Sequence, residues 1–194
     1  MSKLYFNYSA MNAGKSTILL QASHNYRERG MNTILLTASH YEVDGKTTIT
    51  SRIGIEEEAG KFSDSDDLLA LVRKELRTRP IHCVLIDEAQ FLTEDQVWQL
   101  AQVADELSVP VMCYGLRTDF QGNLFAGSRQ LLAIADNVRE VRTICHCGRK
   151  ATMVARFDDD GNLLKDGDQV AVEKQVYVSY CRSHWAKAMG KYES

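Results

Sequence analysis

The chain has 194 residues, of which 44% are hydrophobic and 25% are charged, and it carries a formal net charge of -3 with a pI near 6.0. This length allows one well-buried domain with a small appendage and argues against two full-sized domains. The weakly negative charge gives no general attraction to nucleic acid or to an anionic membrane, so we expect neither as a partner and favour a small, soluble substrate.

The first 140 residues alternate strand-like and helix-like patterns, which predicts an α/β fold with a mostly parallel P-loop (RecA-like) sheet flanked by helices. Residues 3–8 and 31–38 are expected strands. Between them, a helix is expected from Lys15 to about Arg29, with Gly30 in the position of a left-handed C-cap. Residues 39–62 turn polar and glycine-containing, which predicts a mobile excursion.

Two further strands and two helices complete the predicted sheet domain. Asp64 or Ser65 is the expected cap of a helix that Pro80 ends, and residues 81–87 have the continuous apolar character of a buried strand. A capping box at residues 93–96 opens a helix to about residue 107, residues 109–116 form another buried strand, and a helix near residues 127–137 closes the domain.

Beyond Val141 the pattern changes to short β-like runs at residues 150–157 and 175–180, around the turn DDDGN. We therefore expect two units. Residues 1–140 form a nucleotide-binding α/β domain, and residues 141–194 form a small metal-bound subdomain.

The segment SAMNAGKST at residues 9–17 lies between a strand and a helix, as a phosphate-binding loop requires. Loop N–H groups and the helix dipole would point at the phosphates, Gly14 would allow close approach, and Lys15 would add a cation. Ser16 could hold magnesium through its hydroxyl. Ser9 stands where the usual first glycine would be. The alternative is an ordinary strand-to-helix turn that happens to contain Gly-Lys-Ser.

A second motif supports the same chemistry. Asp87 directly follows a buried strand, as a magnesium-positioning carboxylate should, and Glu88 comes next. Glu88 is the candidate general base, and with Lys15 it forms the expected catalytic pair, although the residues alone do not decide between hydrolysis and phosphoryl transfer to a hydroxyl. The expected nucleotide-binding residues are Ser9, Ala10, Met11, Asn12, Ala13, Gly14, Lys15, Ser16, Thr17, Asp87, Glu88, Ala89 and Gln90.

The five cysteines divide into two groups. Cys83 and Cys113 lie in apolar runs, whereas the C-terminal region holds a mixed cysteine and histidine set comprising Cys145, Cys147, Cys181 and His184. Three thiolates and one imidazole suit tetrahedral structural zinc, and four protein ligands would leave no open catalytic position. His146 is an alternative ligand, and unrelated thiols are the other possibility. The split indicates a reducing cytoplasm and not disulfides.

Together these motifs resemble those of the type II thymidine kinases of the bacterial and large-phage kind. The resemblance covers essentially the whole chain and rests on SAMNAGKST, SRIG at 51–54, IDEAQFL at 86–92, YGLRTDF at 114–120, CHCGRKA at 145–151 and YVSYCRSHW at 177–185. It implies transfer of the γ-phosphate of ATP to the 5′-hydroxyl of thymidine or deoxyuridine in nucleotide salvage, with magnesium as a cofactor and Glu88 as the base for the hydroxyl.

The same resemblance implies a thymine pocket formed by Met11, Phe91, Leu116, Phe120 and Tyr177. It also implies a lasso over the nucleoside at about residues 169–177. Here the sequence departs from the family, because Val172-Glu173 replaces the paired glycines often found there. Family members are usually homotetramers under feedback control by thymidine triphosphate.

Two other classes of function remain as alternatives. A nucleic-acid-stimulated ATPase is suggested by DEAQ and by a zinc ribbon, but the chain is too short for a second motor domain. A zinc-stapled interaction module that uses nucleotide as a switch would show slow turnover without nucleoside dependence.

Overall fold

The computed structural model describes residues 2–39, 42–43, 46–169 and 176–192. Its centre is a six-stranded sheet in the order β6-β2-β7-β8-β1-β9, in which every neighbouring pair is parallel. The strands are β1 (Leu4–Ser9), β2 (Thr33–Ala38), β6 (Gly60–Phe62), β7 (Cys83–Ile86), β8 (Val111–Leu116) and β9 (Asn137–Glu140). This confirms the predicted α/β class.

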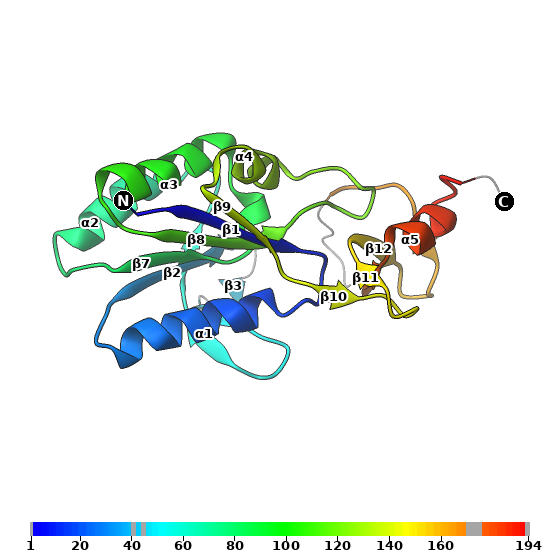
Figure 1. The fold of residues 1–194 in the computed structure, drawn as a ribbon, viewed down its shortest axis with the longest axis horizontal. Helices are drawn as coiled ribbons and strands as arrows, with labels where there is room; N and C mark the ends of the chain where they lie inside the picture. The colour runs from blue at the N-terminus through cyan, green and yellow to red at the C-terminus, as the bar shows by residue number, and fades with distance from the viewer. Residues whose placement is uncertain (1, 40–41, 44–45, 170–175, 193–194) are drawn as a thin grey trace.

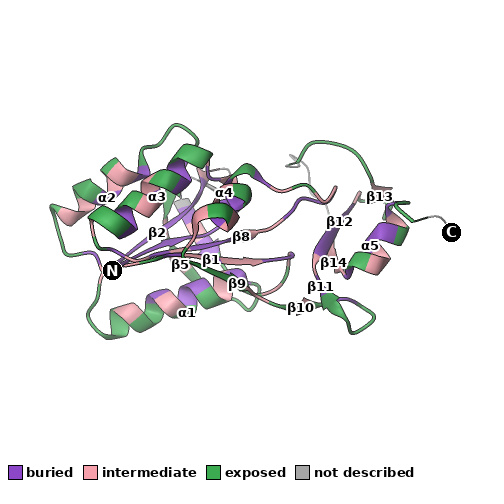
Figure 2. Ribbon diagram, turned by 45° about the horizontal axis from the view of Figure 1, so that its top comes forward, coloured by how far each residue is buried: buried purple, intermediate pink, exposed green. Residues whose placement is uncertain are grey.

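Helices cover both faces of the sheet, as Figure 1 shows. One face packs against α2 (Leu68–Leu76), α3 (Glu94–Glu106) and α4 (Ala126–Ile134). The other packs against α1 (Lys15–Glu28) and β4 (Lys46–Thr50). Neighbouring residues of one strand therefore enter different cores: Leu36 and Ile86 face α2 and α3, whereas Leu35 and Leu85 face α1. Figure 2 shows the resulting buried sheet between half-exposed helices.

The order of the strands determines where the site lies. In a parallel sheet all carboxyl ends meet at one edge, and ligands bind beyond that edge. The P-loop follows β1, Asp87 follows β7, and β8 lies between these two strands. The two motifs therefore lie on either side of β8 at this edge, so a nucleotide can lie across the end of that strand.

The polar excursion contains strands that the sequence did not indicate. It holds a three-stranded antiparallel sheet of β3 (Glu42–Val43), β4 and β5 (Glu56–Glu58), and its last segment is β6 of the main sheet. The sheet is attached to α1 through Glu57, which accepts hydrogen bonds from Ser23 Oγ at 3.3 Å and from the Arg27 guanidinium at 2.7 Å. The mobility expected here stays a prediction.

Two boundary predictions were wrong. Asp67, not Asp64 or Ser65, caps α2 by accepting the Ala70 N–H at 2.8 Å. The two predicted residues lie in the preceding turn, which Asp66 closes by accepting the Ser63 N–H. The helix expected to reach Asn137 ends at Ile134. Asp136 then accepts the Leu4 N–H at 2.8 Å, and the chain adds β9 to the open side of β1.

The C-terminal region has its own small sheets. They are β10 (Thr143–Ile144) with β11 (Lys150–Ala151), and β13 (Leu163–Leu164), β12 (Met153–Phe157) and β14 (Val176–Tyr180) in that spatial order. The predicted turn at residues 158–162 is present, with Asp158 accepting the Asn162 N–H. A short helix, α5 (Arg182–Ala188), follows and packs Trp185 on β12; this helix was not predicted.

Candidate active site

The phosphate loop joins β1 to α1 in a conformation that exposes its backbone. Asn12 and Gly14 both have positive φ angles, of 63° and 82°, and Gly14 is the N-cap of α1. A Cβ at Gly14 would meet nothing within 4 Å, so the glycine is required by backbone conformation and not by space. The unpaired N–H groups at the start of α1 therefore face the carboxyl edge of the sheet, where an anion is favoured.

Ser9 has a direct relation to the loop lysine. Its hydroxyl accepts a hydrogen bond from Lys15 Nζ at 3.0 Å and donates one to the Ala10 carbonyl at 2.5 Å. Lys15 is only 8% exposed. Burial lowers the pKa of its ammonium, and the nearby Glu88 and Asp87 carboxylates act in the opposite direction. A phosphate placed beside Lys15 would compensate a cation that the fold has partly stripped of water.

Ser16 and Asp87 connect the two motifs. Ser16 Oγ donates to Asp87 Oδ2 at 2.9 Å, across 71 residues of sequence. Among the described residues, the buried Asp87 Oδ1 has no hydrogen-bond partner. Burial, followed by the proximity of Glu88, raises the pKa of Asp87 to about 7, whereas the Ser16 hydrogen bond and Lys15 act against this shift. A hydroxyl beside an under-partnered carboxylate is a donor set that suits a hard divalent cation.

Glu88 leaves the strand in a left-handed conformation, with φ 53° and ψ 37°, which is uncommon for a residue with a side chain. The 3₁₀ turn η2 (Ala89–Phe91) follows at once. Gln90 Nε2 donates to Glu88 Oε2, and Gln90 Oε1 accepts the Leu116 N–H at 2.9 Å. Because a backbone N–H can only donate, this contact fixes the amide orientation and directs the NH₂ group at Glu88.

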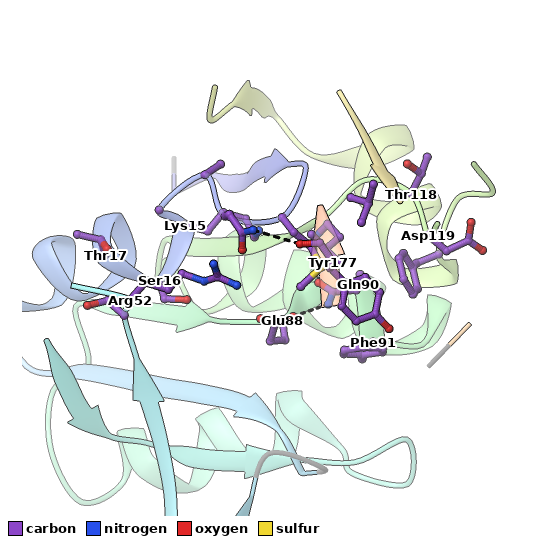
Figure 3. A pocket seen from close by; sticks show the side chains of 18 of the residues that line it. Lys15, Ser16, Thr17, Arg52, Glu88, Gln90, Phe91, Thr118, Asp119 and Tyr177 are labelled. Carbon is purple, nitrogen blue, oxygen red and sulfur yellow. Dashed lines mark hydrogen bonds between the residues drawn. The ribbon is translucent and has the colours of Figure 1, made fainter. Parts of the chain in front are cut away.

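One cavity of about 780 Å³ brings most of the predicted site residues together. Figure 3 shows Lys15, Ser16, Glu88 and Tyr177 around this space. Of the expected residues, the lining includes Met11, Asn12, Ala13, Gly14, Lys15, Ser16, Thr17, Glu88, Gln90, Phe91, Leu116, Phe120 and Tyr177. Ser9, Ala10, Asp87 and Ala89 lie behind the lining as buried residues.

The aromatic side chains of the wall are held in place by contacts with their neighbours. Phe91 packs edge-on against Phe125, with ring centroids 5.7 Å apart. Phe120 is stacked on the Arg156 guanidinium, whose Cζ lies 3.6 Å from the ring centroid. Flat, apolar faces backed in this way suit a planar ring better than a flexible chain.

Several lining residues were missed by the sequence interpretation: Thr50, Ser51, Arg52, Ile53, Thr118, Asp119, Phe125 and Val154. Gln169, the first residue of the expected lasso, also lines the cavity. The SRIG motif was a signal for the first group, and the structure places its tight turn at the end of β4, where Ser51 Oγ accepts the Ile55 N–H at 3.0 Å. Val154 offered no signal, because a valine in a short strand is indistinguishable from core. Residues 170–175, including Val172-Glu173, lie outside the described residues.

The phosphate loop also contacts the C-terminal sheet. Ser179 Oγ donates to the Met11 carbonyl at 2.5 Å, and Asn12 Nδ2 donates to the Tyr177 carbonyl at 3.5 Å. Both partners lie on β14. The same strand therefore supplies an aromatic wall residue and a support for the phosphate loop.

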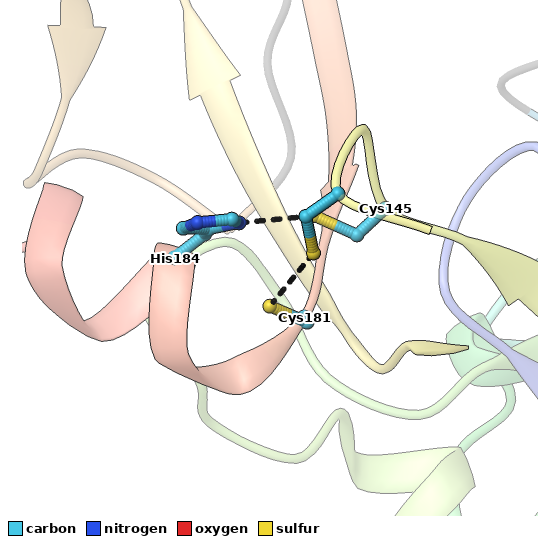
Figure 4. Close-up of side chains that lie close together, drawn as sticks. Cys145, Cys181 and His184 are labelled. Atoms are coloured by element: carbon cyan, nitrogen blue, oxygen red, sulfur yellow. Dashed lines mark hydrogen bonds between the residues drawn. The ribbon is translucent and has the colours of Figure 1, made fainter. Parts of the chain in front are cut away.

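The predicted metal ligands converge at a place that does not belong to the lining of this cavity. The ligand atoms of Cys145, Cys147, Cys181 and His184 all lie within 4.8 Å of one another. Cys147 and Cys181 Sγ are 3.9 Å apart, and His184 Nδ1 is 3.4 Å from Cys145 Sγ; Figure 4 shows His184 turned toward Cys145. Tetrahedral zinc with Zn–S of ~2.3 Å separates sulfurs by about 3.8 Å, so the donor set fits. The alternative ligand His146 is stacked on the His184 ring at 4.3 Å.

The sequence model of the family described as thymidine kinase matches residues 2–185. The chain belongs to the thymidine kinase family. It is 63% identical to the thymidine kinase of Mesorhizobium japonicum over 98% of this chain and 94% of that protein. It is 61% identical to that of Jannaschia sp. over 98% of each chain, and 60% identical to that of Ruegeria pomeroyi over 98% of this chain and 96% of that protein.

Membership of the thymidine kinase family makes the chain an enzyme, an ATP-dependent kinase. Matches that run through both the P-loop region and the C-terminal cysteines favour this interpretation over the ATPase and switch alternatives. In the part of the chain that the structure describes, no helix has the length and apolar character needed to cross a bilayer.

Proposed function

We propose that the protein transfers the γ-phosphate of ATP to the 5′-hydroxyl of thymidine or deoxyuridine, giving the 5′-monophosphate in nucleotide salvage. The observation that carries this proposal is that a single cavity is lined by the phosphate loop, by Glu88 and by the aromatic wall. A phosphate donor and a planar nucleoside would then lie in one continuous space, with the carboxylate between them.

In this proposal the loop from Ser9 to Thr17, with the following Asp87–Gln90 segment, binds ATP and magnesium. Lys15 neutralises charge on the terminal phosphates, and the phosphate loop N–H groups orient them. Ser16 and Asp87 supply the magnesium ligands. Magnesium held by these two side chains would neutralise charge that develops on the transferring phosphate.

Glu88 acts as the general base for the 5′-hydroxyl. Its carboxylate takes the hydroxyl proton as the oxygen attacks the γ-phosphorus, the bond to the ADP oxygen breaks, and the electron pair leaves with ADP. The hydrogen bond from Gln90 holds one carboxylate oxygen, which leaves the other to meet the substrate.

The nucleoside pocket consists of Met11, Phe91, Leu116, Phe120 and Tyr177, which line the cavity with the unpredicted Val154. The apolar faces would hold the thymine ring, and the recess would accept its methyl group. The chain near residues 169–177 would close over the base as a lasso.

We also propose a division of the chain into two units, a structural zinc site and an assembly of four chains. Residues 1–140 would carry the nucleotide site, and residues 141–194 would hold structural zinc through Cys145, Cys147, Cys181 and His184 and cover the nucleoside. The protein would be a cytoplasmic homotetramer, by resemblance to the family. Sedimentation of the purified protein tests the assembly, and a reducing compartment would keep the zinc thiolates available.

The deciding experiment measures ADP release from magnesium-ATP with thymidine, with deoxyuridine, with each other deoxynucleoside and with single-stranded DNA. We expect release only with thymidine or deoxyuridine, together with a product that carries a 5′-phosphate. Release that ignores nucleosides and rises with DNA would contradict the proposal and support the ATPase alternative.

A further inference from the structure

Arg156 is a buried cation that the proposed reaction does not use. It lies on β12, opposite Leu164 of β13 and Tyr177 of β14, and it is 4% exposed. No carboxylate of the described residues forms an ion pair with it. Burying a guanidinium without an acidic partner is costly, so its other contacts must offset the loss of hydration.

The first contact is with the cavity wall. The Arg156 Cζ lies 3.6 Å from the centroid of the Phe120 ring, so the guanidinium is stacked on the ring. Phe120 is 1% exposed but lines the cavity, so its ring has the cavity on one side and the cation behind it. A desolvated cation on an aromatic face is attracted by the negative charge of the ring face. This contact restricts the position of the ring.

The second contact is with the chain that leads toward the cavity. Arg156 Nη1 donates to the Asp168 carbonyl at 2.6 Å, and Nη2 donates to the Asp166 carbonyl at 3.4 Å. Gly167, between these two carbonyls, has φ 128°, and a Cβ there would lie 2.5 Å from Arg156 Nη2. The fork of the guanidinium therefore fits a turn that only glycine permits.

These contacts form a closed ring of interactions. The turn at residues 166–168 leads to Gln169, which lines the cavity and donates from Nε2 to Asp119 Oδ2 at 3.0 Å. Asp119 is buried, accepts two backbone N–H groups of its own loop, and precedes Phe120. Arg156 thus contacts Phe120 of the aromatic wall on one side and the turn at residues 166–168, which leads to Gln169, on the other.

From this arrangement we infer that Arg156 is a positioning residue for the nucleoside end of the cavity, one that sets nucleoside affinity without touching the substrate. The inference rests on the proposed function, because it assumes that Phe120 and Gln169 face the nucleoside. None of these contacts joins Arg156 to a residue of the phosphate loop, so we infer no role for Arg156 there.

The test compares steady-state parameters of four single variants and one double variant with those of the unmodified protein. Arg156→Met removes charge and fork, Arg156→Lys keeps charge but loses the fork, and Gly167→Ala pushes a methyl group against the guanidinium. Gly161→Ala is the matched control: it also has a positive φ, of 81°, in the same sheet region, but its added Cβ meets nothing within 4 Å.

We expect Arg156→Met and Gly167→Ala to raise the KM for thymidine about tenfold, with kcat and the KM for ATP within about twofold of the reference, and Gly161→Ala to leave all three unchanged. The Arg156→Lys value should lie between. Combining Arg156→Met with Gly167→Ala should raise the KM no further than the weaker-binding single variant, because the methyl group no longer meets a guanidinium.

An unchanged KM for thymidine in both Arg156→Met and Gly167→Ala would overturn the inference. The inference would also be overturned if kcat and the melting temperature fell while both KM values rose, since these changes together would indicate a merely structural role. If Arg156→Met does not fold, Gly167→Ala with its control decides the same question. Failure of the proposed function is seen separately, as an unmodified protein without thymidine-dependent ADP release.

Discussion

Gln90 donates a side-chain hydrogen bond to the Glu88 carboxylate and thereby holds one of its two oxygens. The amide is itself fixed by the Leu116 N–H at 2.9 Å. The orientation of the proposed base is therefore set by the end of β8, and not by the strained Glu88 backbone alone.

Glu88→Gln tests the base directly. A glutamine keeps the shape and can present its carbonyl oxygen to Gln90, so ATP and thymidine binding should persist while kcat falls by about 10²–10⁴. The measurement is kcat with both KM values. Glu94→Gln, at an exposed position in the first turn of α3, is the control and should behave normally. Ordinary turnover in Glu88→Gln would end its assignment as base.

Lys15→Met should separate fold stability from nucleotide binding. Burial lowers the pKa of Lys15, so keeping the ammonium charged costs folding free energy, but its attraction to the Glu88 and Asp87 carboxylates offsets part of this cost. Its removal should therefore change the melting temperature of the unliganded protein only slightly. Magnesium-ATP should no longer raise that temperature, whereas a ligand at 100 times its Kd contributes about 2.7 kcal/mol. Scanning calorimetry with and without magnesium-ATP measures both effects. If magnesium-ATP raised the melting temperature of Lys15→Met as much as that of the unmodified protein, residues 9–17 would not be the ATP site.

Cys181→Ser tests the metal cluster. Loss of one thiolate should reduce bound zinc from about one per chain and lower the melting temperature, because metal binding contributes to folding free energy. Elemental analysis of the purified protein measures the zinc. Cys83→Ser is the control: it places a hydroxyl in the fully buried core of the sheet and should reduce stability while zinc stays bound. If Cys181→Ser bound as much zinc as Cys83→Ser and the unmodified protein, the cluster would not be the metal site.

Gly127→Ala should destabilise the protein although glycine-to-alanine changes in helices usually stabilise by about 0.5–1 kcal/mol. A Cβ at Gly127 would lie 2.6 Å from the Ala89 carbonyl oxygen and 2.7 Å from that of Leu92. Overpacking against backbone costs about 1–3 kcal/mol and would displace the turn that carries Gln90. Chemical denaturation measures the change, and a gain in stability would refute the close packing.

The sequence predicted those elements whose signal is local. The buried strands β1, β2, β7 and β8 were predicted within two residues of their ends, and the capping box at Thr93 and Gln96 is confirmed in both of its hydrogen bonds. These features depend on apolar runs and on residues three apart.

Features that depend on distant partners were missed. Strand β9 has little apolar character and forms because β1 offers an open edge. The β4–β5 pair is joined to α1 by the bridge from Glu57 to Arg27, a contact across 30 residues. Lys15, Ser16 and Glu88, which line the cavity, were predicted from motifs, whereas Val154 comes to the cavity only through the folding of the C-terminal sheet.

The hydrogen bonds from Ser179 and Asn12 across β14 and the phosphate loop also have a thermodynamic consequence. A ligand that shifts the loop acts on the strand that carries Tyr177, and a ligand on Tyr177 acts on the loop. Linkage then requires that ATP change the affinity for nucleoside by the same factor as nucleoside changes the affinity for ATP. The affinity of either site is thus a property of the state of both.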